Sequence, residues 1–527
     1  MAKVILTGLN GYGGNYVREL LQDDGNKLIA VVSGSPEKSP YYPQLLEHGV
    51  HFYKNIESCL ATETPDMAII CTPMHIHYKE VMACVEKGVS VYCEKPLTPT
   101  LDTLLDIKKV AKEKDAVVAV GFQWSFSKGI QALKSDILSG KYGKLKSIKS
   151  IANWVRPVSY YKESNWKGRN ADASGQIIFD NIASNAAAHY LHNILFLSGA
   201  EMSKSLDLEG ARYTARAYRA HDIETFDTLS VKIKKDDVQV GFWATAVSDH
   251  PGTVEFEAVC EQARIVYPYG EEKHIAAIKE DGSVILYDNP DNDRFKHYLE
   301  VAASLENDKY AACDVETVEA FQKVIEYLRL KVDVQEFDEN NVVRTEENVF
   351  VNGISERLRK AYTEETDLEE VQMLALIVAH TNNRVIGNAG CIPWRIKGEQ
   401  RRFRELTTGN VVVMGRRSYE EIGRPLPNRT TIVISNTKNF DAENCFTAKS
   451  LQEALEIAGN KKVYISGGAR LYEEALPLVE KMYITEIDAE IEGDTFFPEF
   501  DKNDFVKEIN EFVDGDIPYT YVTYTRK

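Results

Sequence analysis

Two stretches of this chain alternate short, β-branched apolar runs with segments patterned as helices, and this rhythm constrains the fold more than any other feature. In residues 1 to about 120 the runs are VILTG, LIAVVSG, MAIICTP, VSVYCEKP and AVVAVGF. In residues 372–527 they are MLALIVAHTNNRVIG, NVVVMG, TTIVIS, KVYISGG and KMYITEID. Strands that alternate with helices form βαβ units with parallel strands. The sequence therefore predicts two separate α/β domains.

The segment between these stretches has a different pattern. From about 145 to 270, strands such as KLKSIKSIANWV and VQVGFWATAV are polar on one side, which is typical of an open antiparallel sheet. Helices are predicted at 295–306 and 315–331, and a charged amphipathic helix at 354–371. We therefore expect four parts in order: a dinucleotide-binding Rossmann domain (1–122), an α+β domain with an open antiparallel sheet (123–350), a helical linker (351–371) and a doubly wound α/β domain (372–527).

Composition excludes several classes of protein. The 527 residues are 44% apolar and 27% charged, as in soluble globular chains. A net charge of −18 repels nucleic acid. No apolar run approaches the roughly 20 residues of a membrane helix, and the start lacks a signal-peptide pattern, so we expect a cytoplasmic protein without nucleic-acid or membrane partners. The eight cysteines form no CxxC or zinc-spaced cluster, so we expect reduced thiols and no metal.

The first predicted strand ends in a glycine-rich turn. Gly8, Gly11 and Gly13 let the backbone approach a pyrophosphate, although Asn10 replaces the middle glycine of a GxGxxG pattern, and a purely structural turn stays open. The second strand ends at Ser33 with no acidic residue, and Lys38 follows. Hydroxyls and a cation suit a 2′-phosphate, so NADP is favoured over NAD, which remains an alternative.

Two later strand ends carry the motifs CTPMHIH and CEKP. Ligands bind at the carboxyl ends of parallel strands, which makes Thr72, Pro73, His75, Glu94 and Lys95 candidate site residues. With these motifs, residues 1 to about 335 resemble the glucose-fructose oxidoreductase and inositol dehydrogenase family. The resemblance implies a sugar or polyol dehydrogenase of unknown substrate, with Thr72, Pro73, His75 and Glu94 at the cofactor and Lys95 as a catalytic residue that contacts the substrate hydroxyl and the nicotinamide region.

The next signature of that family is an Asp-x-x-x-His-x-x-Asp helix, and the matching segment here is NAAAHYLH. His189 is unchanged and is the candidate general acid or base, whereas Asn185 replaces an aspartate and His192 replaces the second one. At i, i+4 spacing Asn185 and His189 are expected on one helix face, where the amide lines the substrate site. This change leaves an altered substrate or a non-catalytic, cofactor-binding scaffold open for the N-terminal half.

The C-terminal stretch carries a longer series of motifs. In order they are NRVIG, IPW, VMGR, IGRPLPNR, SGG and IDAEIEGDT. By this series residues 373–527 resemble dihydrofolate reductase. The resemblance implies NADPH as cofactor, 7,8-dihydrofolate as substrate and Glu399 as the pterin-binding catalytic acid.

Further residues take roles from the same resemblance. Around the substrate we expect Ile392, Trp394, Phe403, Ile422, Thr485 and Arg429, whose planar cation suits the folate α-carboxylate. Around NADPH we expect Ala379, Ile386, Gly415, Arg416, Arg417, Ser418, Ser435, Gly467 and Gly468, because cations, hydroxyls and close backbone approach suit phosphates. Glu421 departs from the family pattern, which has a small hydroxyl residue there.

The sequence thus predicts two nicotinamide-dependent oxidoreductase modules in one chain. One alternative makes the N-terminal half a scaffold that pairs two chains through its open sheet, and a homo-oligomer is expected on this ground. Another makes both sites act on one pterin-like metabolite.

Overall fold

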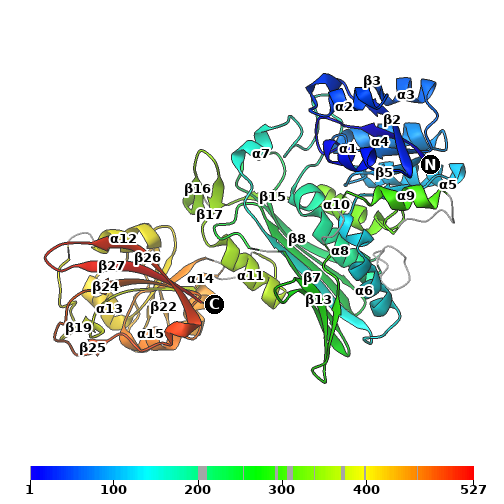
Figure 1. Ribbon diagram of the computed structural model, residues 1–527. Coiled ribbons are helices and arrows are strands. Elements are labelled where there is room, and N and C mark those ends of the chain that lie inside the picture. The colour runs from blue at the N-terminus through cyan, green and yellow to red at the C-terminus, as the bar shows by residue number, and fades with distance from the viewer. Residues whose placement is uncertain are drawn as a thin grey trace. The chain divides into compact units, whose positions relative to one another are not determined.

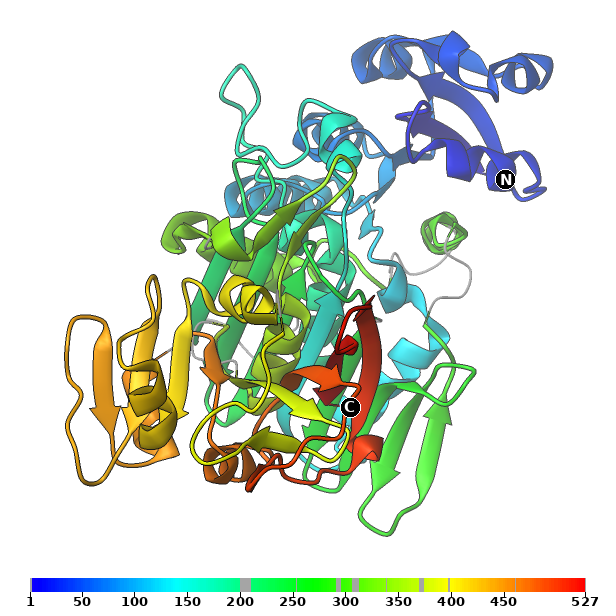
Figure 2. The same ribbon diagram turned by 90° about the vertical axis from the view of Figure 1, so that its left-hand side faces the viewer.

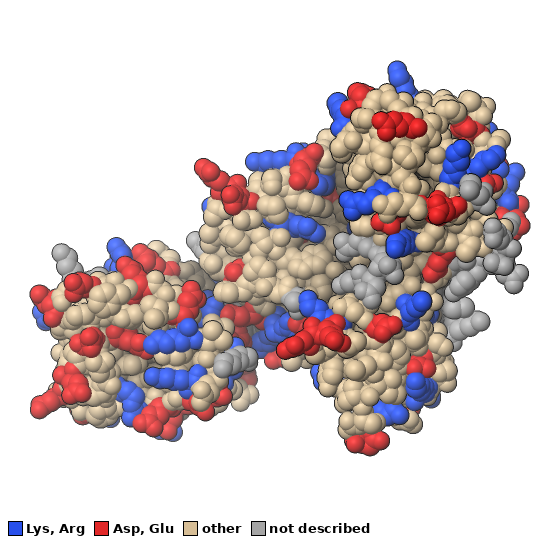
Figure 3. Space-filling view, viewed as in Figure 1, with Lys and Arg blue, Asp and Glu red and all other residues tan. Residues whose placement is uncertain are grey.

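The computed structural model describes residues 2–199, 210–252, 254–290, 295–305, 312–337, 339–368, 374–396, 399–459 and 461–526. It divides into two compact units, one ending at Leu368 and the other beginning at 369. Each unit contains helices and strands, and the predicted α/β fold class is confirmed. In the face drawn in Figure 3, acidic and basic side chains are interspersed, so the net charge is not gathered into one acidic patch there.

The first layer of the N-terminal unit is a six-stranded parallel sheet in the order β3-β2-β1-β4-β5-β6. The strand order reverses between β1 and β4, which is the switch point where such sheets bind nucleotides. The strands are β1 (Ala2–Thr7), β2 (Asn26–Val32), β3 (His51–Tyr53), β4 (Met67–Ile70), β5 (Ser90–Cys93) and β6 (Val118–Val120). The helices are α1 (Gly14–Leu21), α2 (Tyr42–Glu47), α3 (Ile56–Thr62), α4 (Met74–Val85) and α5 (Leu101–Lys114).

The second layer is a nine-stranded sheet in the order β14-β13-β12-β11-β7-β10-β9-β8-β15. It is antiparallel as predicted except at two pairs, β7 with β10 and β8 with β15, which are parallel. The strands are β7 (Leu145–Asn153), β8 (Arg212–Arg219), β9 (Thr228–Lys235), β10 (Val238–Thr245), β11 (Glu255–Cys260), β12 (Ala263–Tyr269), β13 (His274–Lys279), β14 (Val284–Tyr287) and β15 (Val334–Glu336). Figures 1 and 2 show most strands of this sheet in green and β7 in cyan, whereas the Rossmann sheet is blue.

Helices cover both faces of β7 and β10. The helices of this layer are α6 (Lys128–Leu138), α7 (Val158–Lys162), the π-helix η3 (Ile182–Ala186), α8 (Ala188–Ser198), α9 (Tyr298–Ser304), α10 (Glu319–Lys331) and α11 (Ile354–Glu364). Ile148 and Ala152 of β7 belong to the main core, which α8 also joins. Lys149, which points to the other face, donates to the carbonyl of Tyr362 in α11. The two helices therefore lie on opposite faces of the sheet (Figure 1).

The helix α11 corrects the prediction of a linker at 351–371. Ile354, Leu358 and Ala361 are fully buried against β7 and β10. Beyond the helix, Trp243 donates its indole N–H to the carbonyl of Thr366, and Leu368 donates its backbone N–H to Ser230. The segment up to 368 is thus part of the N-terminal unit, because its apolar face is needed to cover the sheet.

The C-terminal unit is built on an eight-stranded sheet in the order β22-β21-β20-β23-β18-β24-β27-β26, parallel except for the pairs that β27 makes. The large strands are β18 (Leu374–Thr381), β20 (Val411–Gly415), β21 (Thr430–Ile434), β22 (Cys445–Ala448), β23 (Val463–Ile465), β24 (Lys481–Ile487), β26 (Phe505–Val513) and β27 (Tyr519–Arg526). The helices are α12 (Glu399–Thr407), α13 (Arg416–Ile422), α14 (Leu451–Ala458) and α15 (Ala469–Ala475). In the same unit, a short sheet pairs β19 (Val385–Gly387) with β25 (Thr495–Phe496). In the N-terminal unit, another short sheet pairs β16 (Val342–Arg344) with β17 (Val349–Val351).

In the described part of the chain, no helix is long and apolar enough to span a membrane. All eight cysteines are free, and Cys391 is the exposed one. No group of three or more His, Cys, Asp or Glu side chains among the described residues is arranged to hold a metal ion.

Candidate active sites

The glycine turn after β1 needs glycine at two of its predicted positions. Gly8 has φ +82°, and a Cβ there would lie 2.5 Å from the carbonyl oxygen of Cys71, while a Cβ at Gly13 would lie 2.8 Å from the carbonyl oxygen of Gly8. The chain packs tightly here and leaves the backbone open to a ligand at the switch point. At Gly11 the nearest atom is 4.0 Å away, so packing does not require glycine there.

Asn10 has a structural contact of its own. Its side-chain amide donates to the carbonyl of Ser35 at 2.6 Å, and the Ser33 hydroxyl accepts from the Ser35 backbone N–H at 3.4 Å. These bonds tie the glycine turn to the loop after β2, where the ribose of a dinucleotide lies in this kind of sheet. Asn10 therefore holds the loop whose hydroxyls and nearby Lys38 were predicted to select the cofactor.

The TPMHIH segment is held by a buried histidine that is not among the predicted site residues. The His77 ring lies 2.6 Å from the Thr72 carbonyl and 2.9 Å from the Pro96 carbonyl, so it joins the ends of β4 and β5. Burial lowers the pKa of His77 to about 4. The Thr72 hydroxyl donates to Glu80, whose carboxyl pKa is raised by burial, and His75 is half-buried near Asp172. The Thr72 and His77 side chains of this motif are thus engaged in hydrogen bonds that hold the loops after β4 and β5.

Lys95 and Asn185 meet in the structure although 90 residues separate them. The Lys95 ammonium donates to the Asn185 side-chain oxygen at 2.9 Å and to its backbone carbonyl at 2.7 Å. The Asn185 amide nitrogen donates to Asp180 at 2.8 Å and to the Tyr160 hydroxyl at 3.3 Å. The Glu94 carboxylate accepts hydrogen bonds from the backbone N–H of Lys95 and from the Tyr16 hydroxyl, so both of its oxygens are hydrogen-bonded within the protein.

Asp180 is the carboxylate that the sequence interpretation missed. It is 2% exposed, and burial raises its pKa to about 6, while hydrogen bonds from Gly168 and Asn185 and the charge of Lys95 oppose the rise. A negative charge is therefore present near Lys95 even though position 185 is an amide. The signal available in the sequence was an acid that directly follows the apolar run IIF.

The helix expected through Asn185 and His189 is broken. Asn185 lies in the π-helix η3, and α8 begins only at Ala188, so the two side chains do not share one α-helical face. This corrects the predicted i, i+4 pair: the five-residue η3 turn offsets the two positions. His189 is half-buried and meets the Phe122 ring edge-on, whereas His192 stacks on that ring at 4.0 Å, and burial lowers the His192 pKa to about 3.

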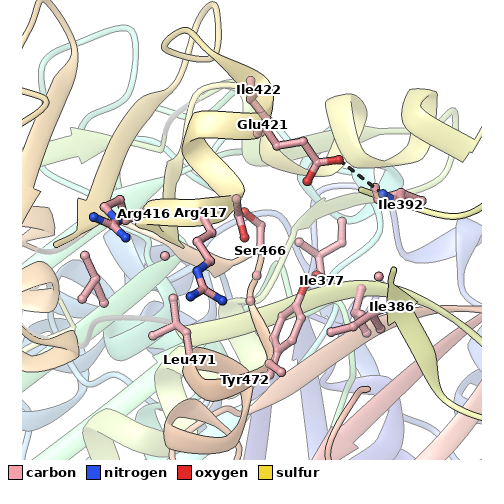
Figure 4. A pocket seen from close by; sticks show the side chains of 18 of the residues that line it. Ile377, Ile386, Ile392, Arg416, Arg417, Glu421, Ile422, Ser466, Leu471 and Tyr472 are labelled. Carbon is pink, nitrogen blue, oxygen red and sulfur yellow. Dashed lines mark hydrogen bonds between the residues drawn. The ribbon is translucent and has the colours of Figure 1, made fainter. Parts of the chain in front are cut away.

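The C-terminal unit encloses a cavity of about 1730 Å³ at the ends of β18, β20 and β23. Most of the residues predicted around the two ligands line it: Ala379, Ile386, Ile392, Trp394, Phe403, Gly415, Arg416, Arg417, Ser418, Ile422, Arg429, Ser435, Gly467 and Gly468. In Figure 4, Arg416 and Arg417 lie toward one end and Ile386 and Ile392 toward the other. Thr485 is not a lining residue; it is buried in β24 beside Ala379. The Glu399 side chain lies outside the described residues, although its backbone begins α12.

One end of the cavity is suited to phosphate groups. Gly467 has φ +124°, and a Cβ there would lie 3.0 Å from the Ser418 hydroxyl, so a side chain would crowd this end. The Gly415 N–H donates to the Gly467 carbonyl and keeps the two loops together. Arg416 donates to Thr437, and the Ser435 hydroxyl accepts two backbone N–H groups, so both side chains are held at the rim. Cations and hydroxyls beside open backbone fit a phosphorylated cofactor.

The other end combines apolar walls with cations. Phe403, a residue of α12, packs against two hydrophobic clusters of this unit. Arg429 is 9% exposed, and its guanidinium donates to the Pro427 carbonyl and to the Thr407 hydroxyl. Burial lowers the Arg429 pKa, and the nearby Arg404 adds to the effect. Glu421 accepts the Ile392 backbone N–H at 3.3 Å, across the mouth of the cavity (Figure 4). This end suits a flat ring with an anionic tail.

Known proteins match both units. Residues 373–526 match the family model of dihydrofolate reductase. Over 154 residues they are 40% identical to dihydrofolate reductase type A13 of Escherichia coli, which covers 29% of this chain and 93% of that protein. Over 129 residues they are 43% identical to dihydrofolate reductase type 3 of Salmonella typhimurium, which covers 24% and 80%. The chain belongs to the dihydrofolate reductase family. The predicted resemblance of this half is confirmed, and the C-terminal unit is a dihydrofolate reductase.

The N-terminal match is to a second family. Residues 2–122 match the model of an oxidoreductase family with an NAD-binding Rossmann fold. The structure is similar in fold to the WlbA dehydrogenase of Bordetella pertussis, solved in complex with NADH and UDP-GlcNAcA, with a TM-score of 0.50 and 18% identity over 62% of this chain and 94% of that one. The predicted second oxidoreductase module beside the dihydrofolate reductase is confirmed.

Proposed function

We propose that the C-terminal unit reduces 7,8-dihydrofolate to tetrahydrofolate with NADPH. The observation that carries this proposal is one continuous cavity of about 1730 Å³ with a phosphate-suited end and a cationic, aromatic end. Cavities for one small ligand are usually about 300–1,000 Å³, so this one has room for substrate and cofactor together. When bound, NADPH supplies the hydride.

The residues of the chain then have distinct tasks. Arg429, with its guanidinium already held by Pro427 and Thr407, binds the folate carboxylate. Phe403 and Ile422 supply the walls for the ring and the benzoyl group. Glu399, at the start of α12, binds the pterin and promotes protonation at N5.

The test is NADPH oxidation with dihydrofolate by the full chain. Glu399→Gln is expected to keep NADPH binding and to lose at least 100-fold in turnover, because general acid–base residues contribute about 10²–10⁴-fold. Glu405→Gln is the matched control, since Glu405 lies on the same helix, is 66% exposed and pairs only with Arg401 among the described residues. Equal turnover by the wild type and Glu399→Gln would contradict the assignment.

For the N-terminal unit we propose an NAD(P)-dependent oxidoreductase whose reacting group is held at Lys95. The glycine turn and the contact between Lys95 and Asn185 support chemistry over a purely structural role. Ser33, and not an acidic residue, directly follows the end of β2, and Lys38 lies in the loop after it, so tighter binding of NADP than of NAD is expected. Fluorescence titration of both cofactors, with Lys38→Met as the variant that should lose the difference, tests this preference.

A homo-oligomer through the N-terminal half stays a proposal. Because α11 covers β7 and β10 on the outer face, we expect two copies to pair through β11 to β14. Sedimentation of the full chain measures this.

A further inference from the structure

Arg156 lies just beyond β7, and the structure gives its guanidinium aromatic contacts but no hydrogen bond or ion pair with any described residue. It lies 5.4 Å from the Trp154 ring and 4.9 Å from the Tyr160 ring. Its Nε is shielded from solvent and has no hydrogen-bond partner among the described residues. A buried donor that is left unpaired destabilises the fold unless a ligand satisfies it. A guanidinium held by two aromatic rings with its donors free is suited to an anion.

A second cation lies on the same tyrosine. The Lys167 ammonium is 3.9 Å from the centre of the Tyr160 ring, and its partner Glu163 is 61% exposed. Glu163 is therefore a solvent-screened counter-ion, which contributes little. Tyr160 thus carries a positive group from two different segments of the chain.

Tyr160 is also linked to Lys95 through the side chain of Asn185. Its hydroxyl accepts from the Asn185 amide at 3.3 Å, and Asn185 in turn accepts from Lys95 at 2.9 Å. Burial and the negative charge of Asp180 raise the pKa of Tyr160, so its hydroxyl stays neutral and can hydrogen-bond. One tyrosine side chain therefore links the free guanidinium to the residue proposed to hold the reacting group.

We propose that Arg156, aided by Lys167, binds a carboxylate or phosphate group of the N-terminal substrate, which is accordingly a small anionic hydroxy compound. This inference rests on the proposed oxidoreductase function. The buried charge of Asp180 repels an anion from the side of Asn185, so the anionic group lies at Arg156 and the hydroxyl lies at Lys95. The orientation of the substrate follows from this charge arrangement.

The experiment uses iodide, an anion that quenches tryptophan on contact, with the NADP-loaded full chain at constant ionic strength. Because Trp154 lies beside Arg156, iodide bound there should quench a saturable part of the fluorescence. Inorganic phosphate or malonate should displace it, and the stronger competitor identifies a phosphate or a carboxylate as the natural group. Acrylamide, which is neutral, gives the collisional baseline.

Arg156→Met should lose the saturable part, and Arg156→Lys should keep it with an affinity about tenfold lower, because the fork geometry is lost. Arg169→Met is the control, since Arg169 is 54% exposed and already paired with Glu224 at 2.7 Å. Binding of two NADP molecules per chain, as in the wild type, shows that both units of each variant are folded. Linear quenching that is the same in the wild type and Arg156→Met overturns the inference. The iodide assay measures anion binding and not turnover. A failure of the oxidoreductase proposal would appear in a turnover assay and can therefore be distinguished from a failure of this inference.

Discussion

Replacing Asp180 by asparagine removes the negative charge that faces Lys95 through the Asn185 amide. Hydrogen bonds of 2.9 and 2.8 Å flank that amide. They place the ammonium and the carboxylate about 7 Å apart, where an effective dielectric constant of about 20 gives an attraction of about 2 kcal/mol. Asp180 is 2% exposed and Lys95 is half-buried, so solvent screens this attraction less than it would between two exposed groups. Loss of the charge should therefore increase the fraction of neutral Lys95 amine about 30-fold.

The assay is trace acetylation of the full chain with acetic anhydride, followed by peptide mass spectrometry. At pH 7.5 the labelling rate of Lys95 should rise about 10–30-fold in Asp180→Asn, relative to the exposed Lys79 as internal reference. The pKa of Asp180, raised to about 6 by burial, adds a pH signature. Below pH 6 the wild-type carboxyl takes up a proton and loses its charge, so the difference between the two proteins should disappear by pH 5.

A double variant separates charge from structure. Asp180→Asn combined with Asn185→Asp moves the carboxylate to position 185, in contact with Lys95, and should return the labelling rate to the wild-type value or below it. If Asp180 only shaped the turn before η3, the single variant would leave Lys95 labelling unchanged at pH 7.5, and the reasoning would be refuted.

Three further predictions concern the substrate, pH and the core. Arg429→Leu should raise the KM for dihydrofolate about 30-fold with kcat little changed in steady-state kinetics, because a hydrogen bond to a charged group contributes about 2 kcal/mol. Burial lowers the pKa of His77 to about 4, so the unfolded chain binds this proton first as the pH falls; His77 should therefore contribute a decrease of about 1.4 kcal/mol per pH unit to the free energy of unfolding from about pH 6.5 to 4, and His77→Gln should lower the slope in denaturant titrations by that amount while the contribution of the buried His192 stays. Leu358→Ala should destabilise the N-terminal unit by about 2–5 kcal/mol in guanidinium unfolding, whereas Leu330→Ala, at a site 57% exposed, should cost less than about 0.5 kcal/mol.

Periodicity carried most of the fold prediction. The β-branched runs of both α/β parts are local signals, and they became strands of two largely parallel sheets. Most of the residues predicted around the C-terminal cavity also line it, because the motifs lie at the ends of adjacent strands. Such sites follow from strand order, which the βαβ rhythm already limits.

The α11 helix was misjudged for a local reason. Its charged residues suggested a solvated linker, yet Ile354, Leu358 and Ala361 repeat at the spacing of one buried helix face. The pattern was present, but the sequence did not show that the sheet leaves an apolar area around Trp243 for this helix to cover.

The N-terminal centre was missed for a different reason. Asn185 was compared with the family position four residues before His189, on the assumption of an unbroken helix, and the π-helix η3 removes that assumption. The same turn places the Asn185 amide between Lys95 and Asp180. A carboxylate is therefore still present near the lysine, and the amide bridges the two groups by hydrogen bonds. In sequence, Asn185 in place of the family aspartate indicates the loss of a negative charge, whereas in the structure a negative charge is present nearby at Asp180. An amide between the two charges lets Asp180 stabilise the Lys95 ammonium without a direct ion pair.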